Sequence, residues 1–250
     1  MKIYVISLIS DDLRRENLKK CFPLTHCHFN FINAVNKTEI YSFIEPENIK
    51  QTKVQISDVE IACAISHSLI YKEMILGDLE SCIVFEDDIL GCDQDINRLI
   101  DIYTKLPKNS ILLAGGMDGM KSRKYLYGKA VFPDVYRIEP AYYKFLVRAC
   151  CYVVPKSIAE KILNSQKNNL IRADEWGYFL KNEKNVYFSP IFHHPLDLAT
   201  SHIEFARRQE LNGFLKRLLR EGLFFTFYKV VDRYFLKIIA KLKGLDSIFK

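Results

Sequence analysis

The sequence predicts an α/β protein built on a mostly parallel β-sheet. Short apolar, β-branched runs cover residues 3–8, 82–85 and 111–114, and polar or glycine-rich turns close each of them. Segments with helical periodicity lie between these runs, and strands that alternate with helices are typical of a sheet buried between helical layers. The chain has 250 residues, 49% of them hydrophobic, which is enough for one such domain and is typical of a globular protein.

The first third of the chain supplies two strands and two helices. A buried strand is expected over residues 3–8, a polar-faced helix over 13–21 and a second strand over 28–32, whereas residues 38–54 show no clear period and are expected to be irregular. Ser57-Asp58-Val59-Glu60 has the pattern of a capping box and predicts the start of a second helix. Ile61, Ile65 and Leu69 continue one face of this helix, and Gly77 is expected to end it.

The middle of the chain continues the alternation. The strand at 82–85 is followed at once by Glu86-Asp87-Asp88, then by a helix over 95–103, a strand over 111–114 and a glycine-rich turn over 115–119. An apolar run over 147–154 ends at Pro155, where proline suits the start of a helix expected over 156–163. A further helix is expected to begin at residue 174.

The positive charge of the chain is concentrated at its C-terminal end. Residues 214–250 contain nine cations and three anions, so this tail accounts for the whole formal charge of +6 and the body is neutral. We therefore expect a catalytic domain over 1–213 and a basic helical tail over 214–250. Apolar residues with helical spacing predict one face of that helix, and cations predict the other; the apolar set is Phe224, Phe227, Tyr228, Val231, Phe235, Ile238, Ile239 and Leu242, and the cations are Lys229, Arg233, Lys237 and Lys241. This pattern indicates an interfacial helix on an anionic membrane surface, with packing on the body or on a partner chain as the alternative.

Composition also argues against several classes of protein. Seven cysteines are an odd number scattered through apolar stretches, unlike a disulfide framework. The apolar run at 3–9 is short and lacks a cleavage site for a signal peptide, and no stretch reaches the roughly 18 apolar residues that a spanning helix needs. A neutral body without a recognition motif does not favour nucleic acid. We expect a cytoplasmic protein, peripheral on the inner face of the cytoplasmic membrane.

Three consecutive acids directly after a buried strand are the strongest chemical signal in the sequence. Like charges at this spacing raise one another's pKa, and a divalent cation would relieve the repulsion between Glu86, Asp87 and Asp88. Hard carboxylate oxygens suit Mg²⁺ or Mn²⁺, which bridge readily to substrate phosphates. The carboxyl ends of strands in such sheets open onto the ligand crevice. The alternative is a solvated acidic turn or the N-terminus of a helix.

Three segments carry a resemblance to a known family. They are VISLISDDLRRE at 5–16, VEIACAISHSLIYKEM at 59–74 and CIVFEDDIL at 82–90, with weaker matches in CYVVPKSIAEKIL and RADEWGYFL. All of them resemble glycosyltransferase family 25, the group of bacterial lipopolysaccharide and lipooligosaccharide glycosyltransferases. Val59 and Ala62 stand where the family commonly has Gly, which concerns local packing more than chemistry.

The resemblance implies a nucleotide-diphospho-sugar transferase fold of the GT-A type, a UDP-sugar donor and inversion at the anomeric carbon. In that interpretation Glu86 and Asp88 are metal ligands with His202 as a third, and Glu86 and Asp87 also contact the donor. Asp174 is the predicted base, with Glu175 second, and helix capping is the alternative role of Asp174.

Several other residues have a predicted role in ligand binding and a structural role as the alternative. Arg14 and Arg15 are predicted to bind the diphosphate, although Arg15 is equally suited to a helix surface. Ser66 and His67 match the family's Ser-His pair and are predicted near the donor, or to be structural. At Gly115 and Gly116 we expect a close backbone approach to the ligand, or a plain tight turn. For Trp176 we expect stacking on an acceptor sugar, or core packing.

These expectations combine into one function with alternatives. The leading hypothesis is transfer of a hexose, galactose before glucose, from a UDP-sugar to a lipooligosaccharide core sugar on a lipid-linked acceptor, with Mn²⁺ or Mg²⁺. A nucleotidyltransferase would release pyrophosphate instead of UDP, and a non-catalytic binding protein would consume no donor. The oligomeric state is left open, a homo-oligomer included.

Overall fold

The computed structural model describes residues 1–46, 49–50, 56–196 and 223–249, with the side chains of 223–230 left out. Its strands are β1 (Lys2–Ser7), β2 (Phe29–Asn33), β3 (Ser81–Glu86), β4 (Ile111–Gly115), β5 (Tyr127–Phe132), β6 (Val135–Ile138), β7 (Cys151–Pro155), β8 (Val186–Phe192) and β9 (Asp246–Ser247). Its α-helices are α1 (Asp12–Cys21), α2 (Ile40–Ile44), α3 (Asp58–Leu76), α4 (Asp93–Lys105), α5 (Lys156–Asn168), α6 (Trp176–Phe179) and α9 (Leu223–Leu242). Short 3₁₀ helices cover His26–His28, Lys121–Tyr125 and Pro140–Phe145.

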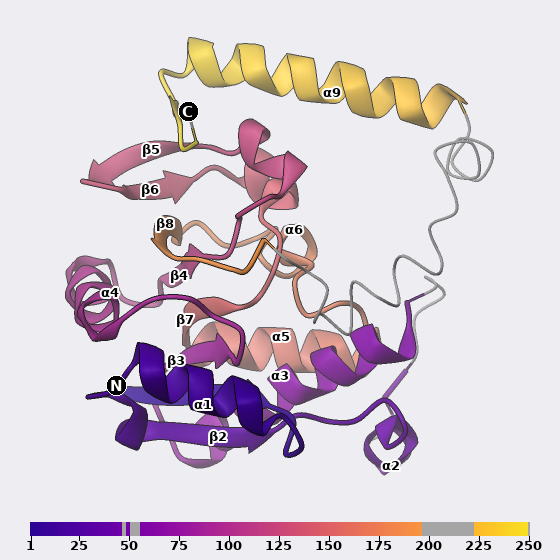
Figure 1. Cartoon of the computed structure of the whole chain (residues 1–250). Coiled ribbons are helices and arrows are strands. Elements are labelled where there is room, and N and C mark those ends of the chain that lie inside the picture. The colour runs from indigo at the N-terminus through magenta and orange to yellow at the C-terminus, as the bar shows by residue number, and fades with distance from the viewer. Residues whose placement is uncertain (47–48, 51–55, 197–222, 250) are drawn as a thin grey trace.

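The described strands form one mixed sheet in the order β2-β1-β3-β7-β4-β8-β6-β5-β9 (Figure 1). The pairings β1–β2, β1–β3 and β4–β8 are parallel, and β7 pairs antiparallel with both β3 and β4. Following these pairings, β2, β1, β3, β4, β8 and β5 run one way, while β7, β6 and β9 run the other. The ends of β3, β4 and β8 and the start of β7 therefore lie at one edge of the sheet.

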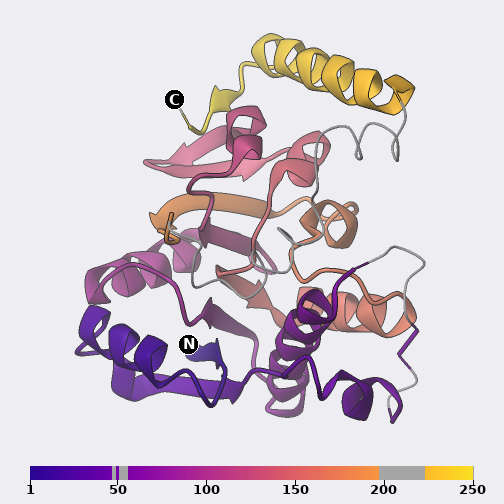
Figure 2. The same ribbon diagram turned by 45° about the vertical axis from the view of Figure 1, so that its right-hand side comes forward.

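Helices cover both faces of the sheet, as the alternation of strand side chains requires. Ile83 and Phe85 of β3 join the core under α1 and α4, whereas Cys82 and Val84 join the core under α3 and α5. The two helical layers lie on opposite sides of the sheet in Figure 2. The α/β class expected from the sequence is confirmed.

The predicted capping box at the start of α3 is confirmed. The Ser57 backbone N–H donates to Glu60 Oε2 at 3.0 Å, and the Glu60 N–H donates to Ser57 Oγ at 3.4 Å. Gly77 is the C-cap, as predicted. The cap orients the first turn of a helix whose later turns carry Ser66 and His67 into the interior.

Two segments differ from their predicted structure. The irregular stretch expected over 38–54 contains the short helix α2, whose Ile40 and Ile44 bury their side chains against the core. The apolar run expected as a strand over 147–154 enters the sheet only at Cys151, because Arg148 adopts a positive φ of 66°. A left-handed residue breaks the extended conformation, so burial of this run does not make all of it a strand.

The predicted C-terminal helix is present as α9, which lies beyond β5 and β6 in both views (Figure 1, Figure 2). After it, β9 pairs antiparallel with β5 and closes that end of the sheet. No helix among the described residues is long and apolar enough to cross a membrane. The division of the chain at 213/214 stays a prediction, and residue 213 lies outside the described residues.

Candidate active site

The three consecutive acids lie where β3 ends, at the edge of the sheet that also holds the ends of β4 and β8. Glu86 is the last residue of β3, whereas Asp87 and Asp88 lie in the turn that follows it, and the three side chains point in different directions. Glu86 faces α3, where its Oε1 lies 3.1 Å from His67 Nε2. Asp87 faces α1 and accepts a hydrogen bond from Arg14 Nη1 at 2.7 Å. Asp88 Oδ2 lies 3.4 Å from His194 Nε2 in the segment after β8.

Arg14 and Asp87 form a tight pair at the start of α1. Burial raises the pKa of the Asp87 carboxyl, and the bond from Arg14 offsets part of that rise. Burial alone would lower the pKa of Arg14, but Asp87 and the nearby Asp88 raise it above its usual value. Arg14 Nη1 also lies 3.7 Å from Asp88 Oδ2. The guanidinium predicted to bind a diphosphate is thus engaged by the acid cluster itself.

Asp88 is the acid whose surroundings are least complete. Burial raises its pKa, but the contact with His194 and the nearby charges of Arg14 and Arg148 together outweigh this, and the pKa of Asp88 is lowered. In turn, Asp88 raises the pKa of His194 above its usual value, against the effect of burial. The second carboxylate oxygen, Asp88 Oδ1, is buried and has no hydrogen-bond partner among the described residues. Buried carboxylate oxygens without partners are costly, so this atom marks a place for a cation or another donor.

Glu86 belongs to a second, more enclosed network. His67 is 2% exposed, and its Nδ1 lies 2.8 Å from the Tyr152 hydroxyl, which in turn lies 2.8 Å from the Tyr71 hydroxyl. Burial raises the pKa of Tyr152 and of Tyr71, so both phenols stay protonated. Cys63, His67 and Glu86 each offer a ligand atom within 4.8 Å of the others. Glu86 is therefore oriented by a buried histidine, in a set that a thiophilic metal would also fit.

Arg148 joins the ends of the neighbouring strands, and sequence reasoning did not single it out. Its guanidinium Nη1 donates to the carbonyl oxygens of Gly116 at 2.9 Å and Asp118 at 3.0 Å. Asp118 in turn accepts from the His194 backbone N–H at 3.0 Å. Arg148 lies inside an apolar run, and no local pattern distinguishes it from a surface cation. Only the fold brings it to the acids.

Gly115 and Gly116 serve the packing of the protein itself. A Cβ on Gly115, where φ is 138°, would lie 2.0 Å from the Phe192 carbonyl oxygen of β8. A Cβ on Gly116, where φ is 78°, would lie 2.2 Å from Cys150 Sγ. Of the two predicted explanations, close approach to a ligand is not needed, because neighbouring protein atoms already require glycine.

Asp174 and Trp176 hold the unusual backbone of Arg148 from both sides. Asp174 Oδ2 accepts a hydrogen bond from the Arg148 N–H at 2.9 Å, and Trp176 Nε1 donates to the Arg148 carbonyl at 2.8 Å. Trp176 is 0% exposed and packs edge-on against Tyr152. No face of the ring reaches solvent, which supports core packing, the alternative predicted for Trp176; stacking on an acceptor sugar stays a prediction.

Glu175, the second predicted base, pairs with an arginine instead of a strand-end residue. Its Oε1 lies 3.2 Å from Arg172 Nη1, and Arg172 Nε also donates to Glu60 Oε1 at 2.6 Å. Arg172 thus ties the start of α3 to the segment before α6. Asp174 stays a candidate base, since its backbone partner Arg148 also reaches the site.

Ser66 and Arg15 also have structural roles here. Ser66 is 1% exposed; its hydroxyl donates to the Ala62 carbonyl at 2.8 Å and accepts from the Val35 N–H at 2.9 Å. These contacts support the structural alternative, and contact of Ser66 with a donor stays a prediction. Arg15 Nε donates to Ser7 Oγ at 3.1 Å, and its guanidinium lies over the Phe31 ring. Arg15 thereby joins the ends of β1 and β2.

His194 is the late histidine that the structure brings to the acids. His202, the histidine predicted from the sequence as a metal ligand, lies outside the described residues. His193 is the immediate neighbour of His194, and its Nδ1 lies 3.1 Å from Asp118 Oδ1. The pair of adjacent histidines following a strand was the available signal, but spacing alone does not decide which of them faces Asp88.

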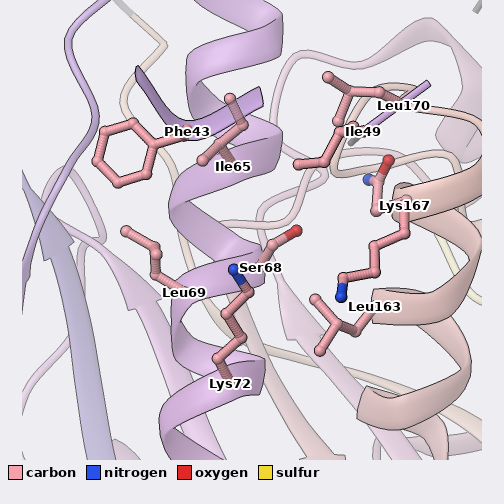
Figure 3. A pocket seen from close by; sticks show the side chains of 10 residues that line it. Phe43, Ile49, Ile65, Ser68, Leu69, Lys72, Leu163, Lys167 and Leu170 are labelled. Atoms are coloured by element: carbon pink, nitrogen blue, oxygen red, sulfur yellow. The ribbon is translucent and has the colours of Figure 1, made fainter. Parts of the chain in front are cut away.

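A small apolar hollow lies elsewhere, between α2, α3 and α5 (Figure 3). Phe43, Ile65, Leu69 and Leu163 line it, and none of the three acids does. The lining is mostly apolar, and its polar members are Ser68, Lys72, Gln166 and Lys167. We therefore place the candidate site at the strand ends, where buried charge is gathered.

The fold and this site define an α/β protein with a carboxylate centre at the carboxyl edge of its sheet. The family model described as glycosyltransferase family 25 (LPS biosynthesis protein) matches residues 1–176, which include β1, α3 and the acid cluster. The chain belongs to this family.

Individual relatives agree with the family over shorter stretches. The chain is 34% identical over 88 residues to "Lipooligosaccharide biosynthesis protein lic2B" of Haemophilus influenzae, covering 35% of this chain and 33% of that protein. It is 33% identical over 198 residues to "Lacto-N-neotetraose biosynthesis glycosyltransferase LgtE" of Neisseria meningitidis serogroup B, covering 75% of this chain and 59% of that protein. The chain thus spans less than two thirds of these relatives. Among solved structures, mannose-1-phosphate geranyltransferase from Thermus thermophilus matches with a TM-score of 0.42 at 11% identity, covering 76% of this chain and 74% of that one.

Proposed function

We propose that this protein is an inverting glycosyltransferase that moves a hexose from a UDP-sugar to a core sugar of a lipid-linked lipooligosaccharide. The proposal depends on the strand-end centre, by which we mean Glu86, Asp87, Asp88 and His194, in a chain of family 25. In this centre Asp88 Oδ1 has no hydrogen-bond partner among the described residues. The names of the two relatives, one in lipooligosaccharide biosynthesis and one a glycosyltransferase, support a saccharide acceptor.

The residues at this centre suit a divalent cation. Asp88 and His194 would hold it, because an imidazole nitrogen and a carboxylate oxygen that has no partner among the described residues lie together at the carboxyl edge. When bound, Mn²⁺ or Mg²⁺ would neutralise charge on the departing diphosphate. Glu86, a predicted ligand, faces His67 instead, and we propose that it contacts the donor sugar or diphosphate region from the α3 side.

The chain's own residues would also position the reactants. The Arg148 guanidinium donates to the carbonyl oxygens of Gly116 and Asp118, and because these acceptors are neutral its charge is available to an anionic donor. Asp174 is the proposed base, which would accept the proton of the acceptor hydroxyl as that hydroxyl attacks the anomeric carbon. Because Asp174 contacts the Arg148 backbone, the base and the donor-side cation are coupled in position.

A donor screen with two readouts tests the proposal. Purified protein is incubated with UDP-galactose, UDP-glucose or UDP-N-acetylglucosamine, a truncated core acceptor and Mn²⁺ or Mg²⁺. We expect UDP release that depends on the acceptor, fastest with UDP-galactose, and loss of release on chelation with recovery on adding metal back. Fastest release with UDP-glucose would support the alternative glucosyltransferase.

Two other outcomes would replace the proposal. Release of pyrophosphate from a sugar phosphate and UTP would identify a nucleotidyltransferase instead. Tight UDP binding without consumption of any donor would indicate a non-catalytic binding protein. We further propose that the protein acts at the inner face of the cytoplasmic membrane, where a lipid-linked acceptor would be met.

A further inference from the structure

Helix α9 is held to the body along one narrow side. Leu236 and Ala240 are 7% and 0% exposed, and the Tyr142 hydroxyl donates to the Leu236 carbonyl at 2.8 Å. Two ion pairs flank this line of contact, between Lys144 and Asp232 and between Lys243 and Glu139. Beyond the helix, Ile248 is buried in the same core and β9 pairs with β5. The helix is therefore fixed relative to the sheet.

The opposite side of α9 is apolar and exposed. Val231, Phe235, Ile238 and Leu242 follow one another at spacings of four, three and four residues, which places them in one line along an α-helix. Their exposed fractions are 47%, 61%, 56% and 82%. Tyr234, also exposed, borders the line. We call these residues the outer stripe; Figure 1 shows α9 at the outside of the molecule, with β5 and β6 on its inner side.

Cations accompany the outer stripe along one flank. Arg233, Lys237 and Lys241 recur every fourth residue and are exposed, which places them together on the helix surface beside Tyr234. Arg233 also lies over the Tyr125 ring of the body, whereas Lys237 and Lys241 lie farther along the exposed flank. Between residues 231 and 243 the single acid is Asp232, and it is paired with Lys144 on the inner side.

We propose that the outer stripe is an interfacial docking face for an anionic lipid surface, held rigidly to the catalytic body. A line of exposed apolar side chains bordered by cations is the pattern of a helix that lies in the plane of a membrane interface. The cations decide between occupants, because a second copy packed on the same stripe would bring two rows of like charge together. This deepens the proposed function, on which it rests, by naming the surface at which the acceptor is met.

Sedimentation with vesicles tests the docking face in the full chain. The vesicles are phosphatidylcholine alone or phosphatidylcholine mixed with phosphatidylglycerol. The wild-type protein is expected to bind the mixed vesicles and to bind phosphatidylcholine much less. The double variant Phe235→Glu/Ile238→Glu is expected to lose at least about tenfold in binding, because it places two anions in the stripe. Lys237→Ala is expected to lose about fivefold on mixed vesicles, because each interfacial cation adds attraction to anionic lipid.

Leu76→Glu is the matched control. Leu76, at the end of α3, is 82% exposed, the same fraction as Leu242, but it lies outside the stripe. It is expected to bind as the wild type does, whereas Leu242→Glu should bind more weakly. Equal binding by Leu242→Glu and Leu76→Glu, or wild-type binding by the double variant, would overturn the proposal. The proposal would also be overturned if the wild type bound no vesicles but formed a dimer in analytical ultracentrifugation that the double variant did not form. That result would assign the stripe to a second copy.

The same variants separate this proposal from the proposed function. The double variant should release UDP from a soluble acceptor at the wild-type rate, with an unchanged melting temperature. Vesicle binding by a protein that consumes no donor would refute the transferase and leave the docking face standing. Point variants are preferable to deleting the chain after Gly213, because that deletion also removes the core residues Leu236, Ala240 and Ile248.

Discussion

The strand-end centre and the outer stripe of α9 depart from ordinary packing in opposite ways. At the strand ends, charged groups are buried: Asp87 is 7% exposed, and Asp88 Oδ1 lacks a partner within the described part of the chain. On α9, large apolar side chains are exposed and cations lie beside them. Buried polar groups and exposed apolar patches are the informative exceptions in a folded protein. Each region therefore lacks the partner that its proposed ligand would supply. A cation and a diphosphate would pair with the buried charges at the strand ends, and lipid would cover the exposed apolar side chains of α9.

Two acids of the body, Asp93 and Asp88, differ in how completely their oxygens are hydrogen-bonded. Asp93 is as buried as Asp87, and its carboxylate accepts hydrogen bonds from Thr25 Oγ1, the Thr25 N–H and the Leu24 N–H. It is a satisfied structural acid. Asp88 has one oxygen near His194 and one that the described residues leave without a partner. Substituting the two acids should therefore affect different properties.

The largest expected effect follows from Asp88→Ala. Turnover should fall by about a thousandfold or more, because electrostatic stabilisation of the leaving diphosphate is lost. The melting temperature should change little, since the substitution removes a partly unsatisfied buried charge. UDP release and thermal unfolding measure the two effects. Near-normal turnover in this variant would remove the metal assignment.

A smaller loss is expected for Asp174→Asn. If Asp174 is the base, kcat should fall by about a hundredfold or more while KM for the donor stays near its wild-type value. Asn keeps an oxygen that can accept from the Arg148 N–H, so the backbone contact survives. Glu175→Gln is the control, because Glu175 pairs with Arg172, and it should keep most activity. A rise in KM for the donor with unchanged kcat would contradict the assignment of Asp174 as the base.

Asp93 should control stability at acid pH, not turnover. Burial alone would raise its pKa, but hydrogen bonds from Thr25 and Leu24 lower it below the usual 3.8. Because the folded pKa is below the unfolded one, its stabilisation is complete above about pH 4 and is lost as the pH falls through the folded value. Asp93→Asn should lower the free energy of unfolding by about 1–2 kcal/mol at pH 7, and the gap from wild type should narrow below pH 4.

Urea unfolding at several pH values measures this gap. Asp101→Asn is a control, because Asp101 is 61% exposed and its pair with Lys105 should contribute less than about 0.5 kcal/mol. A gap that widens toward acid pH would mean that the hydrogen bonds to Asp93 do not favour its ionised form.

The smallest effect concerns the anchoring of α9. Tyr142→Phe removes the hydrogen bond to the Leu236 carbonyl and should lower stability by about 1 kcal/mol. Hydrogen exchange should show faster local opening of α9, while UDP release from a soluble acceptor stays unchanged. Tyr136→Phe offers a comparison on β6, where the tyrosine is half-buried. Unchanged exchange in α9 of the Tyr142→Phe variant would contradict the anchoring role of this hydrogen bond.

Much of the fold followed from local patterns. Ser57 and Glu60 formed the predicted cap, residues 82–85 formed a buried strand, and the acids lay directly after it. Local patterns failed where tertiary contacts decide conformation. The left-handed Arg148 ended the predicted strand early, because its backbone is held by Asp174 and Trp176. The burial of Trp176 followed from the same contacts.

The sequence predicted that the acids lie at the end of a strand, but it did not predict which residues contact them. Compensation of all three acids by one cation stays a prediction. In this structure Glu86 contacts His67, Arg14 lies near both Asp87 and Asp88, and Asp88 also contacts His194. Strand alternation fixes the direction of Glu86 alone, because Asp87 and Asp88 lie in the turn after β3. Which residues stand opposite each acid depends on helices and loops far away in the chain; Arg14 and Asp87 are separated by 73 positions.

The sequence by itself determined the strand-and-helix alternation, the place of the acids at a strand end and the amphipathic, basic character of the C-terminal helix. These are local properties, set by side-chain type and spacing. Only the tertiary structure decided which acid keeps an oxygen unpartnered by the described residues and which side of α9 faces the body. Both depend on long-range contacts, because a side chain's charge state and exposure are set by the residues that fold against it.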